Sequence, residues 1–481
     1  MKLSKLINNI KMTKYNKNFD DLDIKNIKID NREVEEGDMF IALKGEDFIG
    51  NDFVYDALKR GAKIVVSEND LYIPNSIQVE NARSFYALAS KNLFDCCCDK
   101  MKIIAITGTN GKTTITNSVS QVLEFDGKKV GQIGTLGAKF DGNVFDTGFT
   151  TPDPYLLHKI FKKMYLKGCE FVVMEASAHA IELNKLDGIT FDVAVLTNIT
   201  EDHLDYFKTM KRYAYAKEKL FLSGNVKKAI ICNDDDYCRE IFKRIKCPKI
   251  KYGLTQYSDV YAGSIDKSFN GSVFECEYLK DIFKIEVPLV GEYNIQNMLA
   301  TIAVSKECGM SLDKIKSALN VIKQPEGRFN VIKFKDSNVV IDFAHTPDGL
   351  ENILKTAKAV SRKKLVVIFG CGGNRDRKKR PIMGRIACKY ADKVVLTSDN
   401  PRWEKPEEII NEIKKGTTKK VEVIVNRKEA IERVLANCDN ETIIIAGKGA
   451  EKYQEIKGVK YPYNDFDVVY EIKDREEETH R

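Results

Sequence analysis

The residues with the clearest chemical signature lie in a short glycine-rich turn, GTNGKTT, at positions 108–114. The apolar run before it, 102–107, predicts a strand, and the apolar spacing after it predicts a helix that ends near Gly127. A strand, a glycine turn and a helix N-terminus direct backbone N–H groups and the positive end of the helix dipole at an anion. In this arrangement Lys112 can reach the terminal phosphates of a nucleotide, and the Thr113 hydroxyl can bind Mg²⁺.

The turn departs from the common phosphate-binding loop, which has a longer spacing between its first glycine and the Gly-Lys pair. Here only Thr109 and Asn110 separate Gly108 from Gly111. A tight strand–helix turn that merely contains a lysine is the alternative, but it would place a cation needlessly at the positive end of a helix. The loop alone therefore predicts a nucleotide site and no particular reaction.

Two later strand ends carry polar side chains. VVMEASAHA places Glu175 at the end of a buried strand, and LTNITEDHLDYF places Asp202 and His203 after the next one. The carboxyl ends of parallel strands meet at one edge of a sheet, so Glu175 and His203 are predicted to lie beside Thr113. A hydroxyl, a carboxylate and an imidazole beside phosphates can bind a divalent metal. A capping or surface role is the alternative for His203.

The pattern of strands and helices predicts an α/β protein. Strand-like runs at 171–177 and 191–199 alternate with helical stretches such as 151–168, which is typical of a parallel sheet with crossover helices. Pro325 and Gly327 break the helical pattern before a third block. That block alternates again, with strands predicted at 338–344, 364–370, 393–399, 421–426 and 442–449. We expect three domains, at 1–100, 101–324 and 325–481.

Composition and charge exclude several classes of protein. The net charge of +7 is the difference between 77 basic and 70 acidic residues, a small excess that argues for anionic small molecules and against nucleic acid. The 12 cysteines lack paired metal-ligand spacing, so we expect reduced cysteines used as small apolar residues. The N-terminal residues lack the apolar core of a signal peptide, and no run is long enough to span a bilayer. The sequence therefore predicts a cytoplasmic protein without a membrane segment.

The motifs taken together closely resemble those of the ATP-dependent Mur ligases. The resemblance covers nearly the whole chain, and the segments that carry it are GTNGKTT, TTPDP (150–154), MEASAHA, TNITEDHLDYFKTM, AYAKEKLF (214–221), GEYNIQNMLATIAV (291–304), EGRFN, IDFAHTPDGLENIL (341–354), FGCGGNRDRKKRPIMG, SDNPRWEKP (398–406) and GKGAEKYQ (447–454). The segment at 29–53 is similar to the UDP-binding segment of that family.

The resemblance implies a fold and a reaction. The fold has three α/β domains: a UDP-binding N-terminal domain, a central ATP-binding domain with a P-loop parallel sheet, and a Rossmann-like C-terminal domain that binds the amino acid. The reaction is ATP-dependent amide ligation through an acyl phosphate. Within the family the chain is most similar to the branch that adds meso-diaminopimelate to UDP-N-acetylmuramoyl-L-alanyl-D-glutamate in peptidoglycan synthesis. A monomeric enzyme is expected.

The resemblance also implies site residues. It assigns catalytic roles to Lys112, Glu175, His203 and Lys217. It also implies two Mg²⁺ sites, whose ligands are Thr113, Glu175, His203 and Lys217, with Lys217 carbamylated by CO₂. Nucleotide contacts fall to Gly108, Thr109, Asn110, Gly111, Lys112, Thr113, Thr114, Asn294, Asn297, Arg328 and Asp342, with His345 on the same side. The residues expected to bind the UDP-sugar-peptide are Asn31, Thr150, Thr151, Ser177 and Lys185. Those expected to bind the amino acid are Arg375, Asp399, Asn400, Arg402, Gly447 and Glu451.

Arg402 carries the choice of amino acid. A guanidinium can grip the second carboxylate of meso-diaminopimelate, whereas lysine would bring an ammonium against it. That like-charge contact costs on the order of 1–3 kcal/mol when desolvated. Glu451 suits the distal ammonium. L-lysine or another diamino acid remains the alternative substrate.

Five positions depart from the usual pattern of the family: Asn31, Asn51, Ala178, Lys185 and Ala450. Most keep a hydrogen-bonding group or a charge, although lysine lacks the fork of arginine. Because of these departures, an enzyme that acts on a modified acceptor substrate is an alternative.

Three other functions remain as alternatives. A folylpolyglutamate-synthase-like ligase shares the short loop but leaves the DNPR segment and the N-terminal block unexplained. A P-loop kinase or regulatory NTPase leaves Lys217 and the third block without a role. A nucleic-acid-binding ATPase lacks an aromatic and basic stripe.

Overall fold

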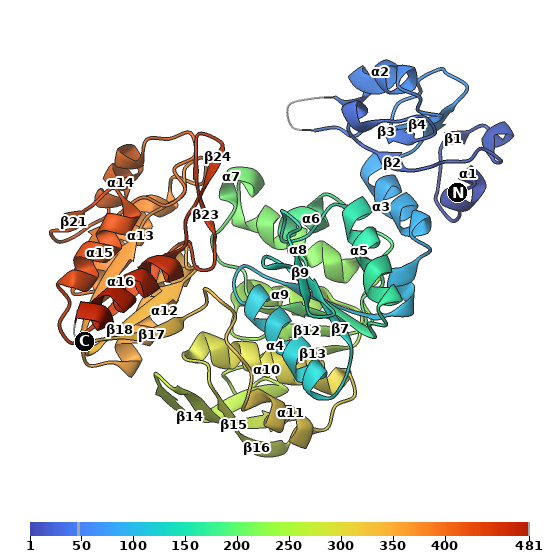
Figure 1. Cartoon of the computed structure of the whole chain (residues 1–481). Helices are drawn as coiled ribbons and strands as arrows, with labels where there is room; N and C mark the ends of the chain where they lie inside the picture. Colours follow the sequence, from blue (N-terminus) through green and yellow to red (C-terminus); the bar gives the residue numbers. More distant parts are fainter. Residues whose placement is uncertain (46–48, 480–481) are drawn as a thin grey trace.

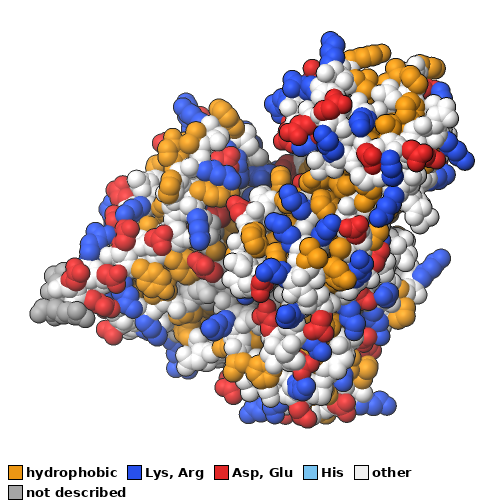
Figure 2. Space-filling model, turned by 45° about the vertical axis from the view of Figure 1, so that its right-hand side comes forward, with side chains coloured by type: hydrophobic (Ala, Val, Ile, Leu, Met, Phe, Trp, Pro, Cys, Tyr) orange, Lys and Arg blue, Asp and Glu red, His pale blue; other side chains and the backbone are white. Residues whose placement is uncertain are grey.

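Three large β-sheets with flanking helices organise the chain in the computed structural model, which describes residues 1–45 and 49–479. The N-terminal block stands apart from the C-terminal block, and the central block lies between and below them (Figure 1). Basic and acidic side chains are interspersed over the face shown in Figure 2, where a recess separates the two outer blocks. The UDP-like segment at 29–53 includes residues 46–48, which lie outside the described residues.

The N-terminal sheet has the order β1-β5-β4-β3-β2. It is built from β1 (Lys14–Tyr15), β2 (Ile27–Lys28), β3 (Met39–Ile41), β4 (Ile64–Ser67) and β5 (Ser76–Gln78). All neighbours are parallel except the β1–β5 pair. Its helices are α1 (Leu3–Leu6), α2 (Val54–Lys59) and α3 (Ala82–Leu93).

The central sheet has eleven strands in the order β16-β15-β14-β13-β12-β11-β6-β10-β7-β8-β9. Its parallel centre consists of β6 (Lys102–Thr107), β7 (Val130–Gly134), β10 (Phe171–Glu175), β11 (Val193–Leu196), β12 (Ala229–Cys232) and β13 (Lys249–Gly253). The helices that join these strands include α4 (Lys112–Phe125), α5 (Pro154–Leu166), α6 (Ala178–Glu182), α7 (Leu204–Phe207), α8 (Met210–Leu222) and α9 (Asp236–Arg244). The predicted helix after the glycine turn is α4.

Both edges of this sheet are antiparallel, which the sequence analysis did not predict. One edge is the meander of β14 (Val260–Ser268), β15 (Gly271–Tyr278) and β16 (Asp281–Val287), and the other adds β8 (Gly137–Phe140) and β9 (Asn143–Phe145). The parallel centre is buried on both faces and consists of apolar runs, whereas in β15 every second residue is buried and those between are partly or fully exposed. The helices α10 (Glu292–Glu307) and α11 (Leu312–Leu319) pack on the same apolar core.

The C-terminal sheet has the order β17-β18-β22-β19-β20-β21 and is parallel except for the β17–β18 pair. Its strands are β17 (Asn330–Phe334), β18 (Ser337–Asp342), β19 (Lys364–Phe369), β20 (Lys393–Leu396), β21 (Glu422–Val423) and β22 (Glu441–Ala446). Its helices are α12 (Pro347–Val360), α13 (Lys379–Tyr390), α14 (Pro406–Lys414), α15 (Arg427–Ala436) and α16 (Asp465–Thr479). Apolar clusters cover both faces of the sheet, as a doubly wound fold requires.

A buried ion pair joins α15, α16 and β22. The Nε and Nη2 atoms of Arg427 each donate to the Asp465 carboxylate at 2.8 Å, and Nη2 also donates to Ala446 O at 3.0 Å. Both side chains are fully buried. Helix and sheet in this block are therefore held by a charge pair that water does not reach.

We expect Arg427→Met to lower the free energy of unfolding by about 3–5 kcal/mol, because Asp465 would be left buried without its counter-charge. Urea unfolding followed by circular dichroism measures this. Lys428→Met is the matched control, since the Lys428–Glu471 pair is solvent-exposed and its loss should leave the unfolding midpoint unchanged. Equal midpoints for the two variants would contradict the role of the buried pair.

Candidate active site

The glycine turn between β6 and α4 is held by the end of β11. Asn198 O accepts from Thr109 N at 2.9 Å, and Asn198 Oδ1 accepts from Asn110 N at 2.9 Å. Thr197 Oγ1 donates to Asn110 O at 2.6 Å. Thr197 and Asn198 belong to LTNITEDHLDYF, but neither was among the predicted site residues. The loop backbone is therefore fixed before any phosphate binds.

Gly108 and Gly111 are required by close approach as well as by backbone conformation. Their φ angles are +143° and +87°, in the region that favours glycine. A Cβ on Gly108 would lie 1.8 Å from Thr197 Oγ1, and a Cβ on Gly111 would lie 2.5 Å from Asn297 Oδ1. The loop can thus pack against β11 and α10 only without side chains at these two positions.

Two lysines converge on the carbonyl oxygen of Gly108. Lys112 Nζ donates to it at 3.0 Å and to Thr109 O at 2.8 Å, while Lys217 Nζ donates to it at 2.8 Å. Lys217, on α8, is almost completely buried, and its Nζ also lies 4.5 Å from the centre of the Tyr213 ring. Burial and the neighbouring Lys112 hold the pKa of Lys217 well below its usual value. Lys217 lies behind the loop and outside the residues that line the phosphate cavity.

Glu175, the last residue of β10, is fully buried beside the loop. Its Oε1 accepts from Thr113 Oγ1 at 2.9 Å and from Thr135 N at 3.0 Å, and its Oε2 accepts from Thr135 Oγ1 at 3.1 Å. Arg328 Nη2, from the segment before β17, donates to Thr113 Oγ1 at 3.2 Å. The structure therefore brings the predicted hydroxyl and carboxylate together, along with an arginine from the third block.

Asp202 and His203 form a half-buried acid–imidazole pair after β11. His203 Nε2 lies 3.3 Å from Asp202 Oδ2, and the backbone N–H of His203 donates to Asp202 Oδ1 at 2.9 Å. Burial lowers the pKa of His203 to about 4, against the opposing pull of Asp202. Burial opposes ionisation of Asp202, but His203 and other neighbouring cations outweigh it and hold its pKa at about 2. At neutral pH the site therefore presents a carboxylate beside a neutral imidazole.

A cavity of about 570 Å³ lies over the phosphate loop. Of the residues assigned to the nucleotide, those that line it are Thr109, Asn110, Gly111, Lys112, Thr113, Thr114, Asn297, Arg328 and Asp342, together with His345. Asn294 lies behind: it is fully buried, accepts from Asn297 Nδ2 at 3.1 Å and donates to Val290 O at 2.9 Å. It orients Asn297.

The third block closes one side of this cavity. The oxygens of Asp342 accept from Phe329 N and Ala344 N at 2.7 Å, which holds the β18 end in place. Asp348 Oδ2, on α12, accepts from Asn110 Nδ2 at 2.7 Å. The sequence analysis did not single out Asp348; its place in AHTPDGLENIL, after a strand end, was the available signal. This bond joins the glycine loop directly to the C-terminal block.

A second cavity of about 170 Å³ adjoins the first. All six residues assigned to the amino acid line it: Arg375, Asp399, Asn400, Arg402, Gly447 and Glu451. The two cavities share Asp202, Phe343, His345, His203 and Arg375. The two cavities therefore meet along a common wall.

Glu451 is already paired within the protein. Its Oε2 accepts from Lys448 Nζ at 2.8 Å and from Asn400 Nδ2 at 2.9 Å. Lys448 is fully buried, so the carboxylate of Glu451 shares its charge with an internal cation. An ammonium ligand at Glu451 would join this pair and not meet a free carboxylate.

The residues assigned to the UDP-sugar-peptide are spread over two blocks. Thr150 lines the phosphate cavity, and Thr151 Oγ1 donates to Glu175 O at 2.8 Å. Ser177 caps α6, and Lys185 Nζ lies 5.3 Å from the centre of the Phe149 ring. Asn31 lies in the N-terminal block, where its Nδ2 donates to Asp56 at 2.7 Å.

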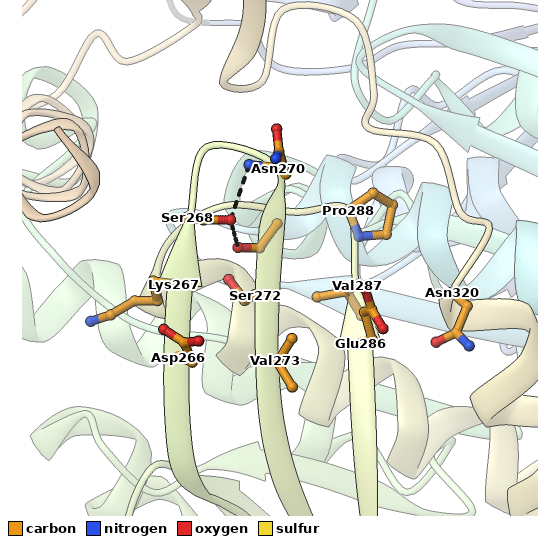
Figure 3. A pocket seen from close by; sticks show the side chains of 11 residues that line it. Asp266, Lys267, Ser268, Asn270, Ser272, Val273, Glu286, Val287, Pro288 and Asn320 are labelled. Carbon is orange, nitrogen blue, oxygen red and sulfur yellow. Dashed lines mark hydrogen bonds between the residues drawn. The ribbon is translucent and has the colours of Figure 1, made fainter.

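A smaller cavity of about 140 Å³ lies at the far edge of the central sheet, between the ends of β14, β15 and β16 (Figure 3). Its side chains include Asp266, Lys267, Ser268 and Asn270, and Lys267 is paired with Glu292 at 2.6 Å. Three strands, β11 to β13, separate this meander from β6. It belongs to the turn region of the meander and holds none of the predicted site residues.

No helix in the described part of the chain is both long and apolar enough to cross a bilayer.

Three family models match the chain. They are the Mur ligase family, catalytic domain, at residues 23–91; the Mur ligase middle domain at 106–305; and the Mur ligase, glutamate ligase domain, at 327–449. The curated relatives include proteins named UDP-N-acetylmuramoyl-L-alanyl-D-glutamate–2,6-diaminopimelate ligase. That of Clostridium perfringens is 41% identical over 463 residues, covering 93% of this chain and 95% of its own. That of Aquifex aeolicus is 39% identical over 454 residues, covering 93% of each chain.

Solved structures agree. A ligase of the same printed name superposes with a TM-score of 0.72 at 32% identity, covering 99% of this chain and 100% of its own. A folylpolyglutamate synthase of Mycobacterium tuberculosis, solved with ADP and AMPPCP, has a TM-score of 0.65 at 19% identity and covers 76% of this chain and 92% of its own. The second likeness shows a shared fold only.

We expect Gly111→Ala to weaken nucleotide binding on the order of tenfold, because the new Cβ would both strain the backbone and displace Asn297. Calorimetric titration with ATP measures this. Gly127→Ala is the control: its φ is +77° but nothing lies within 4 Å of the added Cβ, so only stability should fall. If both variants bind ATP equally well, the close approach at Asn297 has no role in the site.

Proposed function

Because the chain belongs to the Mur ligase family, we propose that it is an ATP-dependent ligase that joins meso-diaminopimelate to UDP-N-acetylmuramoyl-L-alanyl-D-glutamate. The relatives that match nearly the full chain carry this activity in their names. The observation that carries the proposal is the shared wall of the two cavities at Asp202, His203, His345 and Arg375. ATP occupies the first cavity and the amino acid the second, so an activated carboxyl group between them meets both.

In the proposed reaction the acceptor carboxylate attacks the γ-phosphate of ATP, and ADP leaves. The amino group of the amino acid then attacks the carbonyl of the acyl phosphate and expels phosphate. Two anions must approach each other in the first step, so the site needs positive charge around the phosphates. Lys112 and Arg328 supply it from opposite blocks, and the backbone N–H groups of the loop orient the phosphates.

The residues present fit Mg²⁺. The Thr113 hydroxyl and the Glu175 carboxylate are hard oxygen donors held within hydrogen-bond distance of each other. When bound, Mg²⁺ neutralises charge that develops on the phosphates. His203 would serve a second ion through a neutral imidazole, together with a carbamylated Lys217.

The surroundings of Lys217 support carbamylation. Only a neutral amine reacts with CO₂, and burial beside Lys112 favours the neutral form of Lys217. The reaction forms an N–C bond, releases a proton and leaves an anionic carbamate. The product replaces an unfavourable buried cation by an oxygen ligand next to the phosphate loop.

The three blocks divide the substrates in this proposal. Residues 1–100, with Asn31, hold the UDP end of the acceptor, and Thr150, Thr151, Ser177 and Lys185 lead its peptide toward the phosphates. Residues 101–324 hold ATP. Residues 325–481 hold the amino acid, with Arg402 facing the distal carboxylate and Asp399, Asn400, Gly447 and Glu451 around the other end.

We expect phosphate release from ATP, Mg²⁺ and the UDP-dipeptide to require an amino acid, with meso-diaminopimelate effective at concentrations on the order of tenfold lower than L-lysine. A panel of amino acids in a phosphate-release assay measures this. If L-lysine is the better substrate, the proposed role of Arg402 is wrong. Release that is independent of every amino acid would show that the protein is not this ligase.

We expect Lys217→Ala to lose most of its kcat and to recover part of it in millimolar acetate or propionate, which restore an oxygen ligand. Lys219→Ala is the control, because Lys219 lies on the same helix and pairs with Glu182 away from the loop. Thermal unfolding of both variants separates loss of chemistry from loss of fold. A well-folded Lys217→Ala with full kcat would falsify the carbamate.

A further inference from the structure

The loop that carries Arg402 is paired to the hairpin of β23 (Tyr453–Ile456) and β24 (Val459–Pro462), which lies beside the C-terminal sheet (Figure 1). Arg402 N donates to Glu455 O at 3.1 Å, and Lys457 N donates to Arg402 O at 2.7 Å. The φ angle of Arg402 is +51°, in the left-handed region that arginine seldom adopts. The hairpin therefore holds the backbone of Arg402 in a conformation that the residue would not choose by itself.

The same hairpin holds the guanidinium. Arg402 Nε donates to Glu455 Oε2 at 3.0 Å, and Nη1 donates to Gly373 O at 2.8 Å. Nη2 makes no hydrogen bond to any of the residues that the structure describes. Both side chains of the ion pair are only about one-fifth exposed, at 21% and 23%. Arg402 lines the amino-acid cavity, whereas Glu455 lies outside the residues that line it.

We propose that Glu455 is a positioning residue for the amino-acid substrate: it anchors Arg402 at Nε, so that Nη2 is presented to the carboxylate of that substrate. This inference rests on the proposed function, because it takes Arg402 to be the residue that meets the amino acid. An arginine side chain has many rotamers, and fixing one of them before binding removes an entropic cost from the binding step. The hairpin performs this through one side chain and two backbone bonds.

A competing arrangement has the opposite consequence. If Glu455 occupied the place of the substrate carboxylate, its removal would free Arg402 and tighten binding. The contact lies at Nε, near the root of the guanidinium, and Glu455 is tied to Arg402 by backbone bonds that a substrate does not break. These contacts favour a positioning role for Glu455.

The test compares Glu455→Ala and Glu455→Gln with the wild-type enzyme in the phosphate-release assay. Glutamine keeps an oxygen that accepts from Nε, so it should rescue most of the loss. Glu471→Gln is the matched control, since Glu471 lies in the same block in an exposed ion pair with Lys428. Calorimetric titration with meso-diaminopimelate measures binding of the amino acid directly.

We expect Glu455→Ala to raise the KM and the calorimetric Kd for meso-diaminopimelate on the order of tenfold. The KM for ATP and the kcat should stay within about twofold of wild type. Unchanged or lower values for meso-diaminopimelate in Glu455→Ala would overturn the inference, as would an equal loss for ATP. If the wild-type enzyme prefers another amino acid, the proposed substrate fails, and the same ratios measured with the preferred amino acid still decide the role of Glu455.

Discussion

The carbonyl oxygen of Gly108 accepts from two lysine nitrogens, Lys112 at 3.0 Å and Lys217 at 2.8 Å, and the site depends on this convergence. It ties the start of α4 to the middle of α8 across the glycine turn. Burial, and next the neighbouring Lys112, hold the pKa of Lys217 well below its usual value. Burial lowers the pKa of both lysines, and further for Lys217, although both donate to the same atom. In the proposed function Lys112 binds phosphate and Lys217 reacts with CO₂ as an amine.

The central and C-terminal blocks meet at the glycine loop. Arg328 donates to Thr113 and Asp348 accepts from Asn110, so the C-terminal block contacts the loop through two hydrogen bonds. Arg375 lines both cavities, so in the proposed reaction it lies between ATP and the amino acid. Each block supplies part of the site, and the chemistry requires that both be in place together.

Much of the site was predictable from residue types at strand ends. Thr113, Glu175 and His203 follow or end strands of one parallel sheet, and parallel strands place their carboxyl ends at one edge. The family of the chain was also predictable, because its motifs occur in order along almost the whole sequence. Asn294 was assigned to the nucleotide but lies behind Asn297, since residues three apart on a helix share a face at different depths. The antiparallel edges of the central sheet were not predicted, because alternating apolar and polar residues give a weaker strand signal than the continuous apolar runs of strands that are buried on both faces.

The sequence by itself determined the strand–turn–helix of the phosphate loop, the α/β class and the set of charged residues available to the substrates. These depend on local spacing and on periodicity, which a linear chain displays directly. Only the tertiary structure decided that Lys217 is buried beside Lys112, that Glu451 is paired with Lys448, and that Glu455 anchors Arg402. Glu455 and Arg402 are separated by 53 positions in the chain, and their contact exists because a hairpin folds back on the loop. Burial and ion pairing are properties of such long-range packing, and they determine which charges are free to act.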